Sequence, residues 1–454
     1  MKIDFIKRGA ETRLILIFAG WSTDARFYSE CIVDGWDTAV IYDYRDMAFP
    51  GIPAQYTTVF VFAYSLGVWV ASKCDIDAAL RVAVCGTPAP VSDYLGIPEH
   101  IFSGTATGLS AASLSKFHRR MAGDRASYER MTRLLAKDPD VDSLKEELIS
   151  ISAQSKGEWN SSMRWHRAYV AMKDNIFPVE NQIRFWSEFS DAQVIRLQSP
   201  HYVDLASVVR QCIPVCADIG HGFSRAVSSY NKNAVVQKEV CQRIEEILAG
   251  HFTPGNRSVG SLLEIGAGSG MLTEHWCRVL CPDSATYVDL VDMPKFNKAN
   301  IEQYVVEDAE LWLEKSGGKF DVIVSASTIQ WFADPVGFVR SVRSHLNAGG
   351  IAVLSTFVSG NLEQLDSIRT SPVIYRSAAE YGAIPGVVVE QWTRTLTFET
   401  SRDMLMHLLN TGVSPRSKSK DKKTEAEASG NPLRIAGLPT SLTYTPLILV
   451  IENK

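Results

Sequence analysis

Continuous apolar runs alternate with helix-compatible segments through most of the first 200 residues. Such runs are typical of strands that are covered on both faces of a parallel sheet. The strands that they predict span residues 13–19, 38–42, 57–62, 81–85, 167–172 and 194–197, with a helix over 68–74. Strands that alternate with helices predict an α/β domain with a mainly parallel sheet.

The alternation stops between about residues 105 and 167. The apolar positions there recur at helical spacing, with charged residues on the opposite face. This pattern predicts three amphipathic helices, over residues 109–121, 127–136 and 141–151. We therefore expect a helical insertion between two strands of the first sheet.

A second α/β pattern begins after about residue 218, where the composition changes at Phe223. Its predicted strands start at Leu262 and cover residues 262–265, 285–290, 304–309, 320–327 and 351–357, with an edge-type strand over 441–451 at the end of the chain. Residues 414–425 are polar and charged, which predicts a mobile surface loop. The chain is thus expected to form two domains, residues 1–217 and 218–454.

The composition narrows the class of protein. The 454 residues are 46% hydrophobic and 21% charged, as in soluble globular proteins. A net charge of −5 gives no general attraction for nucleic acid or anionic membranes. The eight cysteines lack the histidine partners and spacing of a zinc site, and no apolar run reaches the length of a membrane span. We expect a cytoplasmic protein with reduced thiols and no bound metal.

Ser65 lies in Ala63-Tyr64-Ser65-Leu66-Gly67, directly after a predicted strand. The segment has the form of a nucleophile elbow, G-x-S-x-G, with alanine at the first small position. The elbow requires small residues two before and two after the serine, because its tight turn presses them against neighbouring backbone. A serine at this point could also cap the following helix, so the choice between a nucleophile and a helix cap depends on the other residues of the domain.

A general base and an acid follow Ser65 in the order expected of α/β-hydrolases. Asp174 comes directly after the strand at 167–172, and His201 follows the strand at 194–197. In a serine esterase the histidine takes the serine proton, the acid orients the histidine, and backbone N–H groups, here those of Trp21 and Leu66, bind the oxyanion. Asp93 also follows a strand, so it remains the alternative acid.

The first half resembles the BioG-type pimeloyl-[acyl-carrier protein] methyl ester esterases of biotin synthesis over roughly residues 1–215. The resemblance rests on the modified elbow and on four further segments, residues 20–21, 86–88, 96–98 and 117–121. It implies an α/β-hydrolase in which the helices of residues 105–167 form a lid. It also implies an acyl carrier protein as partner, for which Arg119 and Arg120 are the candidate contacts.

A glycine-rich turn follows the first strand of the second half. It reads Glu264-Ile265-Gly266-Ala267-Gly268-Ser269-Gly270, and such turns let backbone N–H groups approach a nucleotide closely. The third position after Gly268 is Met271 rather than the glycine of the dinucleotide fingerprint. The turn resembles the E/D-x-G-x-G-x-G motif of Rossmann-like methyltransferases that use S-adenosylmethionine, which makes Glu264 and the three glycines candidate cofactor contacts.

Two acids complete the expected cofactor site. Asp292 follows the second strand and is placed to bind both ribose hydroxyls, with Asp289 as the alternative if the strand ends earlier. Asp308 resembles the acceptor that this class of methyltransferase offers to the adenine amine. Each acid could instead end a strand or cap the following helix.

The segment of residues 223–237 resembles the N-terminal lid of BioC-type malonyl-[acyl-carrier protein] O-methyltransferases. No Asn/Asp-Pro-Pro-Tyr/Phe run follows the fourth strand, which argues against an amine nitrogen as methyl acceptor. A carboxylate needs no general base, so positioning and desolvation suffice. The candidate positioning residues are Tyr230, Gln330 and Trp331.

Together, the two resemblances imply a bifunctional enzyme of biotin synthesis. One half would methylate malonyl-acyl-carrier protein, and the other would hydrolyse the methyl ester of pimeloyl-acyl-carrier protein. The alternative is a methyltransferase for small carboxylic acids, fused to a carrier-docking domain without activity or to an unrelated carboxylesterase.

Overall fold

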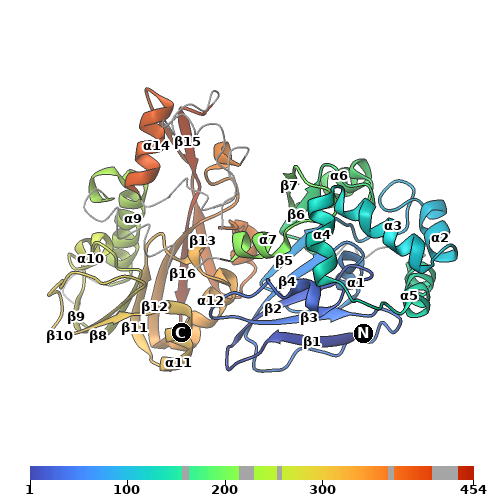
Figure 1. Ribbon diagram of the computed structural model, residues 1–454. Coiled ribbons are helices and arrows are strands. Elements are labelled where there is room, and N and C mark those ends of the chain that lie inside the picture. Colours follow the sequence, from blue (N-terminus) through green and yellow to red (C-terminus); the bar gives the residue numbers. More distant parts are fainter. Residues whose placement is uncertain (156–162, 214–229, 253–257, 367–372, 412–437) are drawn as a thin grey trace. The chain divides into compact units, whose positions relative to one another are not determined.

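The computed structural model describes residues 1–155, 163–213, 230–252, 258–366, 373–411 and 438–454. The chain forms two compact units, Met1–Gln211 and Cys212–Lys454 (Figure 1). The expected boundary at residue 218, the residues before Tyr230 in the resemblance to a methyltransferase lid, and the polar loop of residues 414–425 lie outside the described residues.

The N-terminal unit contains a seven-stranded sheet in the order β1-β3-β2-β4-β5-β6-β7. All pairs are parallel except the pair of β1 with β3. The strands are β1 (Lys2–Lys7), β2 (Arg13–Phe18), β3 (Asp37–Tyr42), β4 (Thr58–Tyr64), β5 (Leu80–Val84), β6 (Arg167–Ala171) and β7 (Gln193–Leu197). Every residue of β2 is buried, as expected for a central strand covered on both faces.

The sequence analysis missed β1. None of its residues is buried and three of the six are charged, so it lacks the apolar run that marks the inner strands. The helices α1 (Gly67–Lys73), α6 (Val179–Glu188) and α7 (Leu205–Cys212) belong to the same unit.

The helical region of this unit consists of α2 (Glu99–Thr107), α3 (Ala111–Ala122), α4 (Arg125–Leu134) and α5 (Val141–Gln154). The last three were expected, whereas α2 extends the region to six residues before the predicted start at 105. Three of the four helices, α3 to α5, begin at a serine or aspartate whose side chain accepts a hydrogen bond from the first turn.

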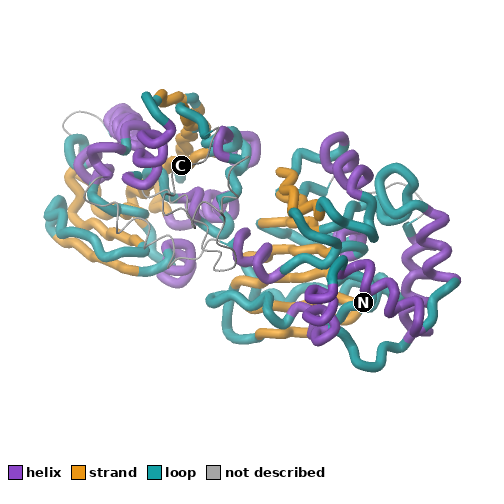
Figure 2. The backbone as a smooth tube through the Cα atoms, turned by 45° about the horizontal axis from the view of Figure 1, so that its top comes forward, coloured by secondary structure: helices purple, strands orange, loops and turns teal. Residues whose placement is uncertain are grey.

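The C-terminal unit contains a second seven-stranded sheet in the order β10-β9-β8-β11-β12-β16-β13. Its strands are β8 (Ser258–Ile265), β9 (Cys281–Asp289), β10 (Ile301–Val306), β11 (Phe320–Ser325), β12 (Leu346–Phe357), β13 (Val387–Gln391) and β16 (Pro446–Glu452). The first five in chain order pair in parallel, and β16 runs antiparallel to both of its neighbours. In each unit the strands form the central layer and helices lie outside it (Figure 2).

The prediction that residues 441–451 form one edge strand was wrong. The segment divides into β15 (Ser441–Tyr444), which pairs with β14 (Arg394–Thr397), and β16, which lies between β12 and β13. The physical reason is visible in β16 itself, because Leu447, Ile448 and Leu449 are all fully buried. A strand with both faces buried cannot be at an open edge.

The remaining helices of the C-terminal unit are α9 (Val235–His251), α10 (Met271–Trp276), α11 (Ala309–Ser316), α12 (Pro335–Val342), α13 (Ala378–Gly382) and α14 (Ser401–Asn410). None of the helices in the described parts of the chain combines the length and the apolar character needed to cross a membrane. The expected location in the cytoplasm stays a prediction.

Candidate active sites

Ser65 lies in the turn that joins β4 to α1, with a left-handed φ of 55°. Two glycines, one of which is the small residue that the sequence analysis required after Ser65, are restricted by close steric contacts. A Cβ atom on Gly67 would lie 2.4 Å from the carbonyl oxygen of Phe18, and one on Gly86 would lie 2.3 Å from that of Ser65. Ala63, the departure from the elbow pattern, is fully buried in the core of the unit.

His201 and Asp174 meet Ser65 in one hydrogen-bonded chain. Nε2 of His201 lies 3.0 Å from Oγ of Ser65, and Nδ1 of His201 lies 2.7 Å from Oδ2 of Asp174. All three residues are less than 9% exposed. Such a chain lets the imidazole take the serine proton while the carboxylate fixes its tautomer.

Asp174 is held from several sides. Its Oδ1 accepts hydrogen bonds from the N–H groups of Ile176 and Phe177, and Nε2 of Gln182 donates to Oδ2. The alternative acid, Asp93, instead accepts a hydrogen bond from the N–H group of Glu99. The carboxylate that contacts His201 is therefore that of Asp174.

Trp21 and Leu66, the predicted oxyanion donors, line the same pocket as Ser65 and His201. Within the described residues, neither backbone N–H group donates to another protein atom. Buried N–H groups are nearly always paired, so two unpaired groups beside a nucleophile suit an oxygen that carries developing negative charge.

The walls of the Ser65 pocket are mainly apolar. They are formed largely by α2, α3, α5 and the segment before α2, through Ile97, Ile101, Phe102, Phe117, Met121 and Leu148. Arg120 also lines this pocket, and both Arg119 and Arg120 are exposed on α3. The two arginines lie near aromatic rings, Arg119 at 5.6 Å from Tyr128 and Arg120 at 6.0 Å from Phe117.

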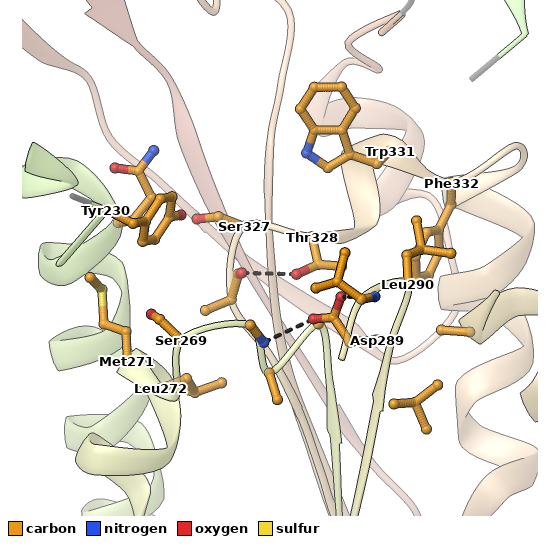
Figure 3. A pocket seen from close by; sticks show the side chains of 18 of the residues that line it. Tyr230, Ser269, Met271, Leu272, Asp289, Leu290, Ser327, Thr328, Trp331 and Phe332 are labelled. Atoms are coloured by element: carbon orange, nitrogen blue, oxygen red, sulfur yellow. Dashed lines mark hydrogen bonds between the residues drawn. The ribbon is translucent and has the colours of Figure 1, made fainter. Parts of the chain in front are cut away.

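A second pocket, larger than that of Ser65, lies in the C-terminal unit around the glycine turn between β8 and α10 (Figure 3). Gly266, Gly268 and Gly270 all have positive φ values, of 71°, 49° and 81°. A Cβ atom on Gly266 would lie 2.1 Å from Oγ1 of Thr328, so only glycine fits there. The turn lines a cavity of about 130 Å³.

Strand β9 ends at Asp289, and this residue lines the pocket. Its Oδ2 accepts a hydrogen bond from the N–H group of Gly268 at 2.8 Å, and burial raises the pKa of its carboxyl group. Asp292, the first choice from the sequence, is exposed, does not line this pocket, and accepts a hydrogen bond from the N–H group of Met293. The strand ends before Leu290, where the sequence analysis had ended it, so the alternative acid occupies the pocket.

Asp308 and Glu264 differ in their relation to this pocket. Asp308 lines it, and its Oδ1 also caps α11 by accepting hydrogen bonds from Glu310 and Leu311. Glu264 is fully buried and is not among the lining residues. Its Oε2 accepts hydrogen bonds from Thr273 and Trp276, both at 2.7 Å, so it fixes α10 behind the turn. Burial raises the pKa of Glu264 to about 7.

Of the three predicted positioning residues, Tyr230 and Trp331 line the pocket and Gln330 does not. Nε2 of Gln330 donates a hydrogen bond to the carbonyl oxygen of Ser327 and so fixes the turn after β11. Burial raises the pKa of the Tyr230 phenol far above its ordinary value. The phenol therefore stays protonated and can donate a hydrogen bond.

Each of the two units is similar to a known family of proteins. The family model described as "Pimeloyl-ACP methyl esterase BioG" matches residues 1–206. The crystal structure of BioG from Haemophilus influenzae is 33% identical, and the match covers 45% of this chain and 94% of that chain, with a TM-score of 0.42. The chain belongs to the BioG family through its N-terminal half. The BioG domain is therefore the unit that contains Ser65, His201 and Asp174.

The C-terminal half matches a model described as "Methyltransferase domain" over residues 233–392. A malonyl-[acyl-carrier protein] O-methyltransferase of Bacteroides fragilis is 29% identical across both halves, over 97% of this chain and 93% of the relative. One from Chlorobium phaeovibrioides is 29% identical over 52% of this chain and 96% of the relative. The glycine turn and Asp289 thus lie in a methyltransferase domain.

Several residues at the two sites were not found from the sequence. Gln182 supports Asp174 from the middle of α6, and Ser327 and Thr328 line the methyltransferase pocket. No motif marks Gln182, because a glutamine in a helix is common. A signal for Ser327 and Thr328 existed, since Ser327 ends the fourth predicted strand and Thr328 follows it, at the edge where parallel sheets bind ligands.

Proposed function

We propose that this chain is a bifunctional enzyme of biotin synthesis. Its C-terminal domain methylates the free carboxylate of malonyl-acyl-carrier protein, and its BioG domain hydrolyses the methyl ester of pimeloyl-acyl-carrier protein. The observation that carries the proposal is the hydrogen-bonded Ser65–His201–Asp174 chain, in a protein that also contains a methyltransferase domain. A relative of nearly full length named for the malonyl-carrier reaction supports it.

The BioG domain acts as a serine esterase on an α/β-hydrolase fold. Ser65 Oγ attacks the ester carbonyl while His201 Nε2 takes its proton, and the N–H groups of Trp21 and Leu66 bind the oxyanion. His201 then gives the proton to the methoxide oxygen as its bond to the carbonyl carbon breaks, so methanol leaves, and water releases the acid from Ser65 by the same steps. Asp174 stabilises the imidazolium without itself being protonated.

The helices α2 to α5 serve as a lid whose apolar side forms the acyl pocket. A methyl ester fused to its own esterase needs protection before the chain is extended, and chain length can provide it. A pimeloyl ester has four more methylenes than a malonyl ester, which is worth about 3 kcal/mol at ~0.8 kcal/mol per buried methylene. The longer ester would thus be preferred on the order of a hundredfold.

The methyltransferase domain uses S-adenosylmethionine, and the residues of its pocket fit this cofactor. The turn from Gly266 to Gly270 brings backbone close to the ligand, Asp289 accepts hydrogen bonds from the ribose, and Asp308 lies where the adenine would bind. When bound, the cofactor supplies an electrophilic methyl group on its sulfonium. The chain itself has to hold the acceptor carboxylate in line with that methyl group.

A carboxylate is already the nucleophile at neutral pH, so no side chain has to remove a proton. Tyr230 stays protonated and donates a hydrogen bond to the carboxylate, and the Trp331 ring excludes water from the same end of the pocket. Methylation also removes the cost of desolvating a charge when the acyl chain later enters an apolar elongation site. The carrier protein is acidic in this proposal and meets Arg119 and Arg120 when it delivers the ester.

The test uses the purified full chain. Labelled S-adenosylmethionine is supplied with malonyl-carrier protein, malonyl-CoA or free malonate, and pimeloyl-carrier methyl ester is added separately to the wild type and to Ser65→Ala. The proposal expects label on the malonyl carrier and ester cleavage only when Ser65 is present. Faster methylation of free malonate, or equal cleavage by both proteins, would contradict it.

A further inference from the structure

The loop after β2 is strained at Ser22. This serine directly follows Trp21 and has a φ of 65°, a left-handed conformation that residues with a Cβ atom rarely adopt. Such conformations persist only where surrounding contacts hold them, and they concentrate at functional sites. The contacts of Ser22 therefore bear on the oxyanion donor beside it.

His118 provides the contact. Its Nε2 lies 3.1 Å from Oγ of Ser22, although the two residues are 96 positions apart in the sequence. His118 is on α3 and is only 9% exposed. Burial lowers the pKa of His118 to about 4, so the imidazole is neutral near pH 7. Neither residue belongs to the Ser65–His201–Asp174 chain.

Trp21 is held by the same helical region. Its indole Nε1 donates a hydrogen bond to the carbonyl oxygen of Leu144 in α5 at 2.9 Å. Its ring meets Phe117 of α3 edge to face, with 5.0 Å between ring centroids. Two consecutive residues of the loop are thus attached to α3 and α5 through three contacts, and the backbone N–H group of Trp21 belongs to the first of these two residues.

We propose that the Ser22–His118 pair is a positioning device that couples the helical region to the oxyanion hole of the BioG domain. The inference rests on the proposed esterase activity. When the pair is intact, the loop holds the Trp21 N–H group where the oxyanion forms. When it is broken, the strained backbone at Ser22 relaxes and this N–H group turns away, while the apolar walls that bind the acyl chain stay in place.

The coupling predicts a loss in the chemical step rather than in binding. An N–H group that is misplaced, but not removed, should cost less than the 10²–10³-fold loss seen when an oxyanion donor is deleted. We expect His118→Ala to lower kcat for pimeloyl-carrier methyl ester about tenfold, with KM changed less than twofold. His118→Gln should restore most of the rate, because a glutamine amide can reach the position of Nε2.

The Ser22 variants form the matched set. Ser22→Ala keeps the Cβ atom that disfavours a positive φ and removes the hydroxyl that holds the loop, so it should match His118→Ala. The double variant should be no slower than either single one, because both changes break the same contact. Ser22→Gly should lose less activity than Ser22→Ala, since glycine adopts a positive φ without strain.

The experiment measures kcat and KM for these variants in the full chain, with methyltransferase activity as an internal standard for folded enzyme. The labelling rate of Ser65 by a fluorophosphonate is a second readout that depends on the oxyanion hole and not on the natural ester. A raised KM with unchanged kcat, or additive losses in the double variant, would overturn the inference. If Ser65 is labelled at rates that follow the variants but no carrier ester is cleaved, the proposed substrate fails and the positioning pair stands.

Discussion

The two pockets of this chain prepare for chemistry in different ways. In the BioG domain the proposed reacting groups are the side chains of Ser65, His201 and Asp174, which are joined to one another by hydrogen bonds of 2.7 and 3.0 Å. The pocket of the methyltransferase domain is lined by the glycine turn and by acidic side chains such as Asp289 and Asp308, and its cavity is larger, at about 130 against 30 Å³. Under the proposed function, ester hydrolysis needs a proton relay, whereas methyl transfer to a carboxylate needs none.

The two pockets also differ in which residue types adopt a left-handed backbone conformation. Seven described residues other than glycine have positive φ. Ser65 belongs to the Ser65–His201–Asp174 chain, Cys85 lies within 4.8 Å of Asp174 and His201, and Ser22 directly follows the pocket residue Trp21. The methyltransferase pocket has Ser327 alone from that set, and takes its other left-handed positions from glycines. The difference concerns the two pockets and not the whole domains, because Asn297 and Leu362 of the methyltransferase unit also have positive φ.

The sharpest way to break this comparison is to remove the acid from the preassembled relay. Asp174→Asn should lower kcat for ester hydrolysis on the order of 10⁴-fold, because an amide leaves the imidazole in the wrong tautomer. Asp93→Asn is the matched control and should change kcat by less than threefold. Steady-state hydrolysis of pimeloyl-carrier methyl ester by the two full-length variants decides it. Equal losses in both variants would mean that the relay does not act through Asp174.

The two domains share one feature, a buried glutamate whose pKa burial raises to about 7. Glu264 lies under the glycine turn, and Glu147 of α5 accepts a hydrogen bond from the N–H group of Tyr44. In each folded domain the buried glutamate binds its proton more tightly than it does in the unfolded chain, where the pKa of the carboxyl group is near 4.5. Each domain should therefore lose stability as the pH rises from about 4.5, with the loss complete above about 7, and the total is about 3 kcal/mol.

Replacement of one glutamate should flatten the pH dependence of its own domain only. Glu264→Gln keeps an acceptor for Thr273 and Trp276 but cannot ionise, and Glu147→Gln does the same for Tyr44. Urea unfolding of the full chain from pH 5 to 8, read by pulse proteolysis with fragments assigned by mass spectrometry, separates the domains. A pH dependence that survives in the replaced domain would assign it to other groups.

The acid of the cofactor pocket gives a smaller effect. Asp289→Ala should weaken binding of S-adenosylhomocysteine about thirtyfold, the equivalent of about 2 kcal/mol for hydrogen bonds to a charged group. Asp292→Ala should leave the affinity within twofold, because this side chain is exposed and lies off the pocket. Calorimetric titration of both variants measures the difference. A larger loss of affinity in Asp292→Ala than in Asp289→Ala would instead assign the ribose contact to Asp292, the first choice from the sequence.

The sequence predicted the strands of both sheets better than it predicted the contacts between side chains. Apolar runs located the inner strands of both sheets, but β1 and β13 have too few buried residues to stand out, and Val388 of β13 is 67% exposed. The choice between Asp289 and Asp292 depended on a strand end, which an apolar run does not define to within three residues. The Ser22–His118 contact joins distant segments, so no local pattern could indicate it.

A last comparison concerns the polar atoms of the methyltransferase pocket. Ser327 Oγ is buried, lines the pocket, and has no hydrogen-bond partner within the described residues. Its hydroxyl is directed toward the Tyr230 side of the pocket and away from Asp289 (Figure 3). Buried hydroxyls are rarely left unpaired, so this atom is suited to bind the methyl acceptor rather than the cofactor.

Ser327→Ala should therefore raise KM for malonyl-carrier protein about fivefold to tenfold, the equivalent of about 1 kcal/mol for one ordinary hydrogen bond, and change S-adenosylhomocysteine affinity by less than twofold. Ser327→Gly is the control for strain, because it removes the same hydroxyl but adopts the φ of 53° freely. If both variants raise KM equally, the hydroxyl is responsible. If only Ser327→Ala raises KM, backbone geometry is responsible. If both variants lose affinity for S-adenosylhomocysteine, Ser327 contacts the cofactor rather than the methyl acceptor.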